Sequence, residues 1–106
     1  MKIAYLDNNA TTRVADEVFE EMKPYFCDLY GNPSSMHSFG GKVGRKITEA
    51  REKVADLIGA EPGEIVFTSG GTESDSTAIW GTLIAHPEKR HIVTTKVEHP
   101  AVKNIF

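Results

Sequence analysis

The feature that most constrains the fold is a glycine-rich turn between an apolar segment and a helical one. Residues 64–68 (EIVFT) are rich in β-branched and aromatic side chains, which is typical of a buried strand. Residues 69–74 (SGGTES) lead into residues 72–85, for which we predict a helix, and residues 91–95 (HIVTT) predict a second strand. Strand, turn, helix and strand in this order indicate a βαβ unit, so we expect an α/β fold with a parallel sheet flanked by helices.

Two parallel strands are too few for a complete sheet of this kind. Natural parallel sheets are covered on both faces and contain more strands than this sequence predicts. Proline at position 100 suits the first turn of a helix, and the sequence stops a few residues later, at position 106. We therefore expect these 106 residues to be the N-terminal part of a longer chain.

The turn at residues 69–74 has the properties of an anion-binding segment. Gly70 and Gly71 allow a tight turn with free N–H groups, and the helix that follows presents unpaired amides and the positive end of its dipole. Thr72 adds a hydroxyl at the same place, and such an assembly suits a phosphate. The segment matches neither the Walker A pattern nor G-x-G-x-x-G. A tight turn with a Ser or Thr helix cap explains the same residues equally well.

His99 follows the second predicted strand by four residues. Ligands of open α/β sheets bind at the carboxyl ends of the strands, where an imidazole can stack on a flat ring or move protons. The alternative is a surface histidine that starts the helix at Pro100, and from this residue alone that alternative is favoured.

Two further helices are predicted before the βαβ unit. A helical pattern begins near Ala15 and should end or kink at Pro24, and a second helix should run over residues 42–58 and stop at Gly59. Between them, residues 30–41 read as a long irregular loop. Cys27 is predicted to be a small buried hydrophobe.

Composition excludes several function classes. Twelve Lys and Arg against fifteen Asp and Glu give a net charge of −3, which does not suit a nucleic-acid binder. A single cysteine cannot staple a secreted domain, and the histidines show no metal-ligand spacing. No apolar run approaches the ~20 residues of a membrane span. With no secretory signal, we expect a cytoplasmic protein that binds neither nucleic acid nor membrane.

Four motifs together resemble a known family. They are residues 5–12 (YLDNNATT), 31–37 (GNPSSMH), 68–74 (TSGGTES) and 97–102 (VEHPAV). In this order they closely resemble the N-terminal quarter of the pyridoxal-phosphate-dependent cysteine desulfurases of aminotransferase class V, most of all the nitrogen-fixation branch. The resemblance covers essentially all 106 residues. It implies an N-terminal arm, helix and loop over residues 1–40, and the start of the large cofactor-binding α/β domain over residues 41–106.

The resemblance also implies a fold, a reaction and a set of site residues. Family members adopt the fold-type I architecture, work as homodimers and take sulfur from L-cysteine, leaving L-alanine and an enzyme persulfide for an iron–sulfur scaffold protein. Carried over, Gly71 and Thr72 bind the phosphate of pyridoxal 5'-phosphate, and His99 stacks on its ring and assists proton transfer as a catalytic residue. Four other residues lie in the family's site-proximal loops without an assigned chemical step: Asn8, Ala10, Asn32 and His37.

The sequence departs from the family pattern by what it does not contain. The family's Schiff-base lysine and persulfide cysteine lie downstream of residue 106, and neither Lys42, Lys46, Lys96 nor Cys27 occupies a matching position. We therefore expect the 106 residues alone to be inactive. Two alternatives remain at this stage: a non-catalytic α/β module that holds a phosphate-bearing ligand, and another class V enzyme such as a selenocysteine lyase.

Overall fold

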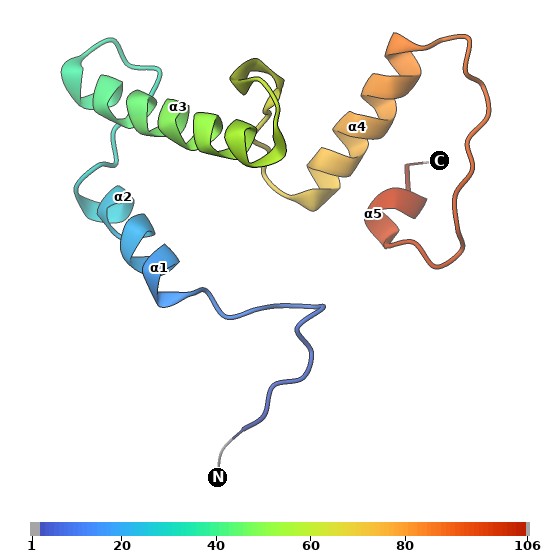
Figure 1. The fold of residues 1–106 in the computed structure, drawn as a ribbon, viewed down its shortest axis with the longest axis horizontal. Helices are drawn as coiled ribbons and strands as arrows, with labels where there is room; N and C mark the ends of the chain where they lie inside the picture. Colours follow the sequence, from blue (N-terminus) through green and yellow to red (C-terminus); the bar gives the residue numbers. More distant parts are fainter. Residues whose placement is uncertain (1–2, 106) are drawn as a thin grey trace. The chain divides into compact units, whose positions relative to one another are not determined.

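A computed structural model describes residues 3–105, and the regular elements within that range are helices. In chain order they are α1 (Asp16–Met22), α2 (Pro24–Cys27), α3 (Ser38–Ile58), the 3-10 helix η1 (Pro62–Glu64), α4 (Gly71–Ala85) and α5 (Pro100–Lys103) (Figure 1). The chain divides into two compact units, one up to Pro62 and one from Gly63 onward, and each is described by itself. The family subdivision expected at residue 40 stays a prediction.

The break between α1 and α2 lies where the sequence predicts it. The amide of Lys23 still donates to the carbonyl of Phe19 at 3.0 Å, which closes the last turn of α1. Pro24 has no N–H to continue this ladder, and it becomes the first residue of α2 instead. Helix α2 is only four residues long and packs against α1. So short a helix buries few of its own side chains, and Cys27 is exposed. The prediction that Cys27 is buried is therefore wrong.

The long helix α3 begins four residues earlier than the predicted start at residue 42. His37 is its N-cap, and the imidazole Nδ1 accepts a hydrogen bond from the amide of Gly40 at 3.1 Å. Histidine is not among the usual capping residues, so the Gly-rich stretch reads as loop when propensity alone is considered. The C-terminus is as predicted, because Gly59 adopts the left-handed conformation at φ 68°.

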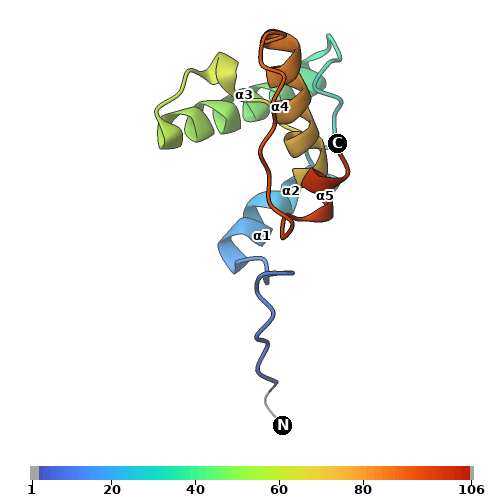
Figure 2. The same cartoon turned by 90° about the vertical axis from the view of Figure 1, so that its right-hand side faces the viewer.

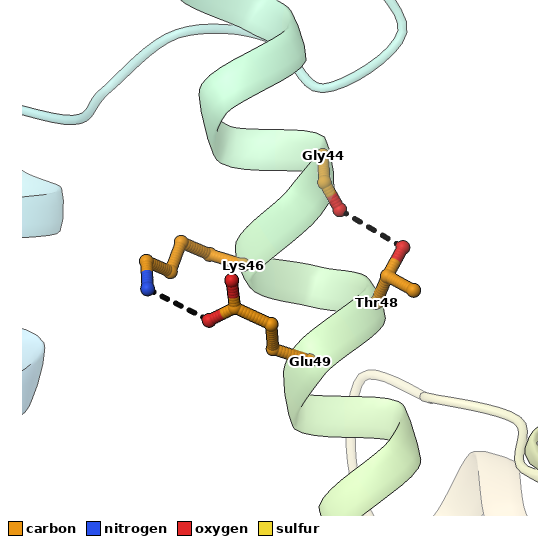
Figure 3. Close-up of polar contacts among 4 residues, drawn as sticks. All are labelled: Gly44, Lys46, Thr48 and Glu49. Atoms are coloured by element: carbon orange, nitrogen blue, oxygen red, sulfur yellow. Dashed lines mark hydrogen bonds and ion pairs between the residues drawn. The ribbon is translucent and has the colours of Figure 1, made fainter.

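The surface of α3 carries both polar pairs and uncovered apolar residues. Lys46 Nζ donates to Glu49 Oε2 at 2.7 Å, and Thr48 Oγ1 donates to the carbonyl of Gly44 at 3.2 Å (Figure 3). The hydrogen bond to Glu49 raises the pKa of Lys46, and the same bond lowers that of Glu49. Of the apolar residues of α3, Val43 is buried, whereas Leu57 is 84% exposed. None of the helices within residues 3–105 is long and apolar enough to cross a membrane.

The loop before α3 folds tightly against the first turn of that helix. Asn32 organises it, since its side-chain Oδ1 accepts from the Ser34 amide at 2.8 Å and its carbonyl accepts from the Ser35 amide at 3.1 Å. Gly40 is buried beneath these residues. A Cβ at position 40 would lie 2.9 Å from Ser35 Cβ and closer still to the Asn32 carbonyl oxygen, so only glycine fits.

We predict that Gly40→Ala loosens this loop and lowers the free energy of unfolding by about 1–3 kcal/mol, the usual cost of overpacking. The matched control is Gly41→Ala, because a Cβ at position 41 meets no atom within 4 Å. That change should instead stabilise the helix by up to about 1 kcal/mol. Urea unfolding followed by circular dichroism compares the two variants, and equal stability of both would contradict the close contact.

In the second unit α4 and α5 pack against each other. Both views place α5 beside the N-terminal half of α4 (Figure 1 and Figure 2). The predicted start of α5 at Pro100 is confirmed. The helix ends at Lys103 within the described residues.

The predicted parallel sheet is not confirmed, because no residue in the described range 3–105 is part of a strand. The strands predicted at residues 64–68 and 91–95 form no ladder with each other, and Glu64 belongs to η1 instead. A strand needs the N–H and C=O groups of a neighbouring strand, which local sequence does not provide. In a parallel sheet such residues are buried on both faces. Here the side chain of Phe67 is 49% exposed and that of Val93 is 86% exposed.

Candidate functional site

The first turn of α4 presents three backbone amides that have no acceptor within the helix. Gly70 is the N-cap and has an extended backbone, with φ 164° and ψ 179°. The first intrahelical bond runs from the Ser74 amide to the Gly70 carbonyl at 3.1 Å. The amides of Gly71, Thr72 and Glu73 precede it, so they lie at the positive end of the helix dipole and can bind an anion.

Side chains on either side of the turn tie it together. Glu73 Oε2 accepts from both the amide and the hydroxyl of Ser69, each at 2.6 Å. The Thr68 and Ser74 hydroxyls form a second tie at 2.6 Å: one donates to the other, and the other donates to the Gly70 carbonyl, which lies 3.2 Å from both. Glu73 and Ser74 stand in the 68–74 motif, but no role was predicted for either of them. The available signal was an acidic residue at the third helical position, which is the acceptor of a capping box.

The space in front of this turn is open. A Cβ at Gly70 or Gly71 would meet no atom within 4 Å. These glycines are therefore not required by close packing inside the protein, and a ligand can approach their backbone. The bare first turn fits a phosphate group, which binds to helix amides in this way.

The structure brings Thr72 and His99 to one hollow of about 310 Å³ between α4 and α5. The other residues that line it are Ser76, Pro100, Ala101, Asn104 and Ile105. Ser76 was missed by the sequence analysis, although it lies one helical turn beyond Thr72 and so on the same face of α4. Gly71 does not line the hollow but immediately precedes Thr72.

A larger hollow of about 630 Å³ lies in the first unit, lined by residues of α1, α2 and α3 together with Leu29. It contains none of the predicted cofactor-binding residues. We therefore place the candidate site at the smaller hollow.

His99 is exposed and is the N-cap of α5. Its Nδ1 accepts a hydrogen bond from the Ala101 amide at 3.1 Å, so this nitrogen carries no proton and the neutral ring is protonated at Nε2. The structure thus shows the helix-starting histidine that the sequence favoured, on the rim of the hollow that Thr72 also lines. Its stacking and catalytic roles stay predictions.

Comparison with known proteins identifies the family of this chain. The sequence model of the family "Aminotransferase class-V" matches residues 4–105. The chain belongs to the aminotransferase class-V family. It is 62% identical over 105 residues to a cysteine desulfurase of Trichormus azollae, covering 99% of this chain and 26% of that protein. It is 57% identical over 106 residues to the cysteine desulfurase NifS of Azotobacter vinelandii, again covering 99% of the chain and 26% of the relative.

The solved structure of a "NifS-like protein" agrees, with a TM-score of 0.83 and 44% identity over 92% of this chain and 27% of that one. The resemblance to class V cysteine desulfurases is therefore confirmed, and the likeness fits the fold-type I architecture of this family. The chain spans about a quarter of the length of these relatives. Nothing in the comparisons supports the alternative of an isolated non-catalytic module.

The open first turn of α4 fits the cofactor of this family. Class V aminotransferases and cysteine desulfurases depend in general on pyridoxal phosphate, which ends in a phosphate group. The three amides, the Thr72 hydroxyl and the empty space at Gly71 provide donors and room for such a group. The described residues thus agree with the expected cofactor.

We predict that the Glu73 carboxyl titrates below its ordinary pKa of 4.5, because the hydroxyl and then the amide of Ser69 bind its ionised form. A lowered pKa in the folded state means that folding favours the ionised group. Its contribution to stability is complete above about pH 4.5 and is lost as the pH falls through the lowered folded pKa. NMR of the Glu73 side-chain carboxyl against pH measures the value. Ser69→Ala should raise it, and an unchanged midpoint would contradict the hydroxyl contact.

Proposed function

We propose that this chain supplies the phosphate-binding part of a cysteine desulfurase that uses pyridoxal 5'-phosphate. One observation carries the proposal: in a class V chain, the first turn of α4 leaves its amides open beside a hollow that Thr72 and His99 both line. The high identity to relatives named cysteine desulfurases supports the specific activity.

The activity belongs to the whole protein, of which this chain represents about a quarter by comparison with its relatives. We propose that the full-length enzyme removes sulfur from L-cysteine, releases L-alanine and leaves a persulfide on a cysteine outside these residues. An iron–sulfur scaffold protein would accept the sulfur, and the enzyme would work as a cytoplasmic homodimer. The similarity to NifS favours the nitrogen-fixation branch.

In this proposal the residues of α4 hold the cofactor by its phosphate. The amides of Gly71 and Thr72 donate to phosphate oxygens, and the Thr72 hydroxyl adds one more donor. Each such bond is charge-assisted, and together they fix one end of the molecule in a defined position. When bound, pyridoxal phosphate supplies an electron sink that stabilises negative charge on the attached amino acid.

His99 would act at the other side of the hollow. Because Nδ1 is engaged by the Ala101 amide, Nε2 is the nitrogen from which this ring can hold or move a proton. The same bond fixes the orientation of the imidazole plane, which suits a ring that stacks on a flat heterocycle. Capping and chemistry therefore use different atoms of one side chain.

In a single turnover, the full-length protein with pyridoxal phosphate and L-cysteine should form alanine and protein-bound sulfane sulfur in equal amounts. The 106-residue chain should show no turnover above that of free cofactor, because the Schiff-base lysine and the persulfide cysteine of the family match no residue in it. Amino-acid analysis and a sulfane-sulfur assay measure both products. Cofactor binding without alanine formation by the full-length protein would contradict the proposed function.

We predict that replacing His99 separates its two roles in the full-length enzyme. Asparagine is among the best N-caps, so His99→Asn should keep α5 and the thermal stability, whereas His99→Ala should lose the cap. Both variants should lower kcat by roughly 100-fold or more, the usual range for a general acid or base.

The control is His86→Ala, because His86 lies at the far end of α4 and pairs with Glu88 at 3.3 Å. It should turn over like the wild type. Normal turnover by His99→Asn would show that residue 99 only caps the helix.

A further inference from the structure

The turn that carries the open amides is held by an acidic side chain, although an acidic group is unfavourable beside a phosphate. Glu73 lies in the first turn of α4, where its carboxylate would repel a phosphate and could itself bind the free amides. Instead its Oε2 is engaged by the amide and hydroxyl of Ser69, both at 2.6 Å. Among residues 3–105, no acceptor bonds the amides of Gly71 and Thr72.

We propose that Glu73 is a positioning residue for the phosphate-binding turn: its paired hydrogen bonds to Ser69 hold the turn open and keep the carboxylate off the amides of Gly71 and Thr72. This inference rests on the proposed function. In this role the acidic side chain prepares an anion site by accepting hydrogen bonds, and its negative charge is not required.

The turn needs such a tie because its central residues cannot restrain themselves. Gly70 and Gly71 have no side chains, their added Cβ atoms would meet nothing within 4 Å, and glycine has the widest backbone freedom of all residues. Without these hydrogen bonds, the two residues would lose conformational entropy when a ligand binds, and this loss would weaken binding. A turn that is already ordered avoids that loss of affinity.

The tie spans the segment that has to be ordered. Ser69 lies before the glycine pair and Glu73 lies after it, so the two bonds close a short ring around Gly70, Gly71 and Thr72. The Thr68–Ser74 hydroxyl pair at 2.6 Å closes a second ring outside the first. The carboxylate bonds are the stronger of the two sets, because ionised acceptors form shorter and stronger bonds.

The experiment compares two probes on the full-length protein freed of cofactor. Pyridoxal lacks the phosphate and forms an internal hemiacetal in solution, but that side reaction is the same for every variant. A change between variants in the ratio of the two dissociation constants therefore reports on the phosphate. Wild type should prefer pyridoxal phosphate strongly, and Thr72→Ala should lose about tenfold or more of this preference with one charge-assisted bond. A wild type without phosphate preference would overturn the proposed function itself, and with it this inference.

The Glu73 variants test the inference separately. Glu73→Ala should lose about tenfold of the phosphate preference while its affinity for pyridoxal changes little. Glu73→Gln is the matched variant, because its amide oxygen can still accept from Ser69 while the negative charge is gone. It should keep the preference of the wild type or exceed it.

Two results would overturn the positioning role while leaving the proposed function intact. One is a Glu73→Ala protein with the wild-type preference, when Thr72→Ala has lost it. The other is a Glu73→Gln protein as impaired as Glu73→Ala, which would make the charge and not the acceptor essential. If Glu73→Ala does not fold, Ser69→Ala decides the question, since it removes one of the two donors. A reduced preference in that variant supports the inference, and an unchanged one overturns it.

Discussion

The interaction on which this site depends is the unsatisfied hydrogen-bonding capacity of a helix start. Every α-helix leaves its first amides without internal acceptors, and most helices satisfy them with a capping side chain or with water. At α4 the N-cap is Gly70, which has no side chain to offer. The carboxylate in the first turn, that of Glu73, accepts from Ser69 instead. The amides of Gly71 and Thr72 thus have no acceptor among residues 3–105, and they lie at the end of α4 that adjoins the hollow beside α5.

The helices could be predicted from sequence because their limits are set by local chemistry. Pro24 stops α1 by lacking an amide, Gly59 ends α3 in a left-handed conformation, and Pro100 starts α5 with a preset φ. The start of α3 was missed because an imidazole at His37 caps it. In each of these cases the deciding contact lies within four residues along the chain.

The strands could not be verified because their partners are not local. Residues 65–68 and 91–95 have the composition of buried strands, but a sheet forms only where several such segments meet. The apolar residues of α4 are also uncovered. Trp80 and Ile84 are exposed, although a helix with so many apolar residues is typical of a protein interior. In the NifS-like structure that this chain matches, 92% of this chain corresponds to only 27% of that protein.

The two histidine caps show why the candidate site needs geometry as well as sequence. His37 and His99 each precede a helix and each accept a backbone amide through Nδ1 at 3.1 Å. Capping alone therefore does not distinguish a functional imidazole from a structural one. The difference lies in what surrounds the ring. His99 shares a hollow with Thr72 at the start of α4, whereas His37 is not among the residues that line it. In His99 the cap orients a ring that lines the same hollow as the start of α4.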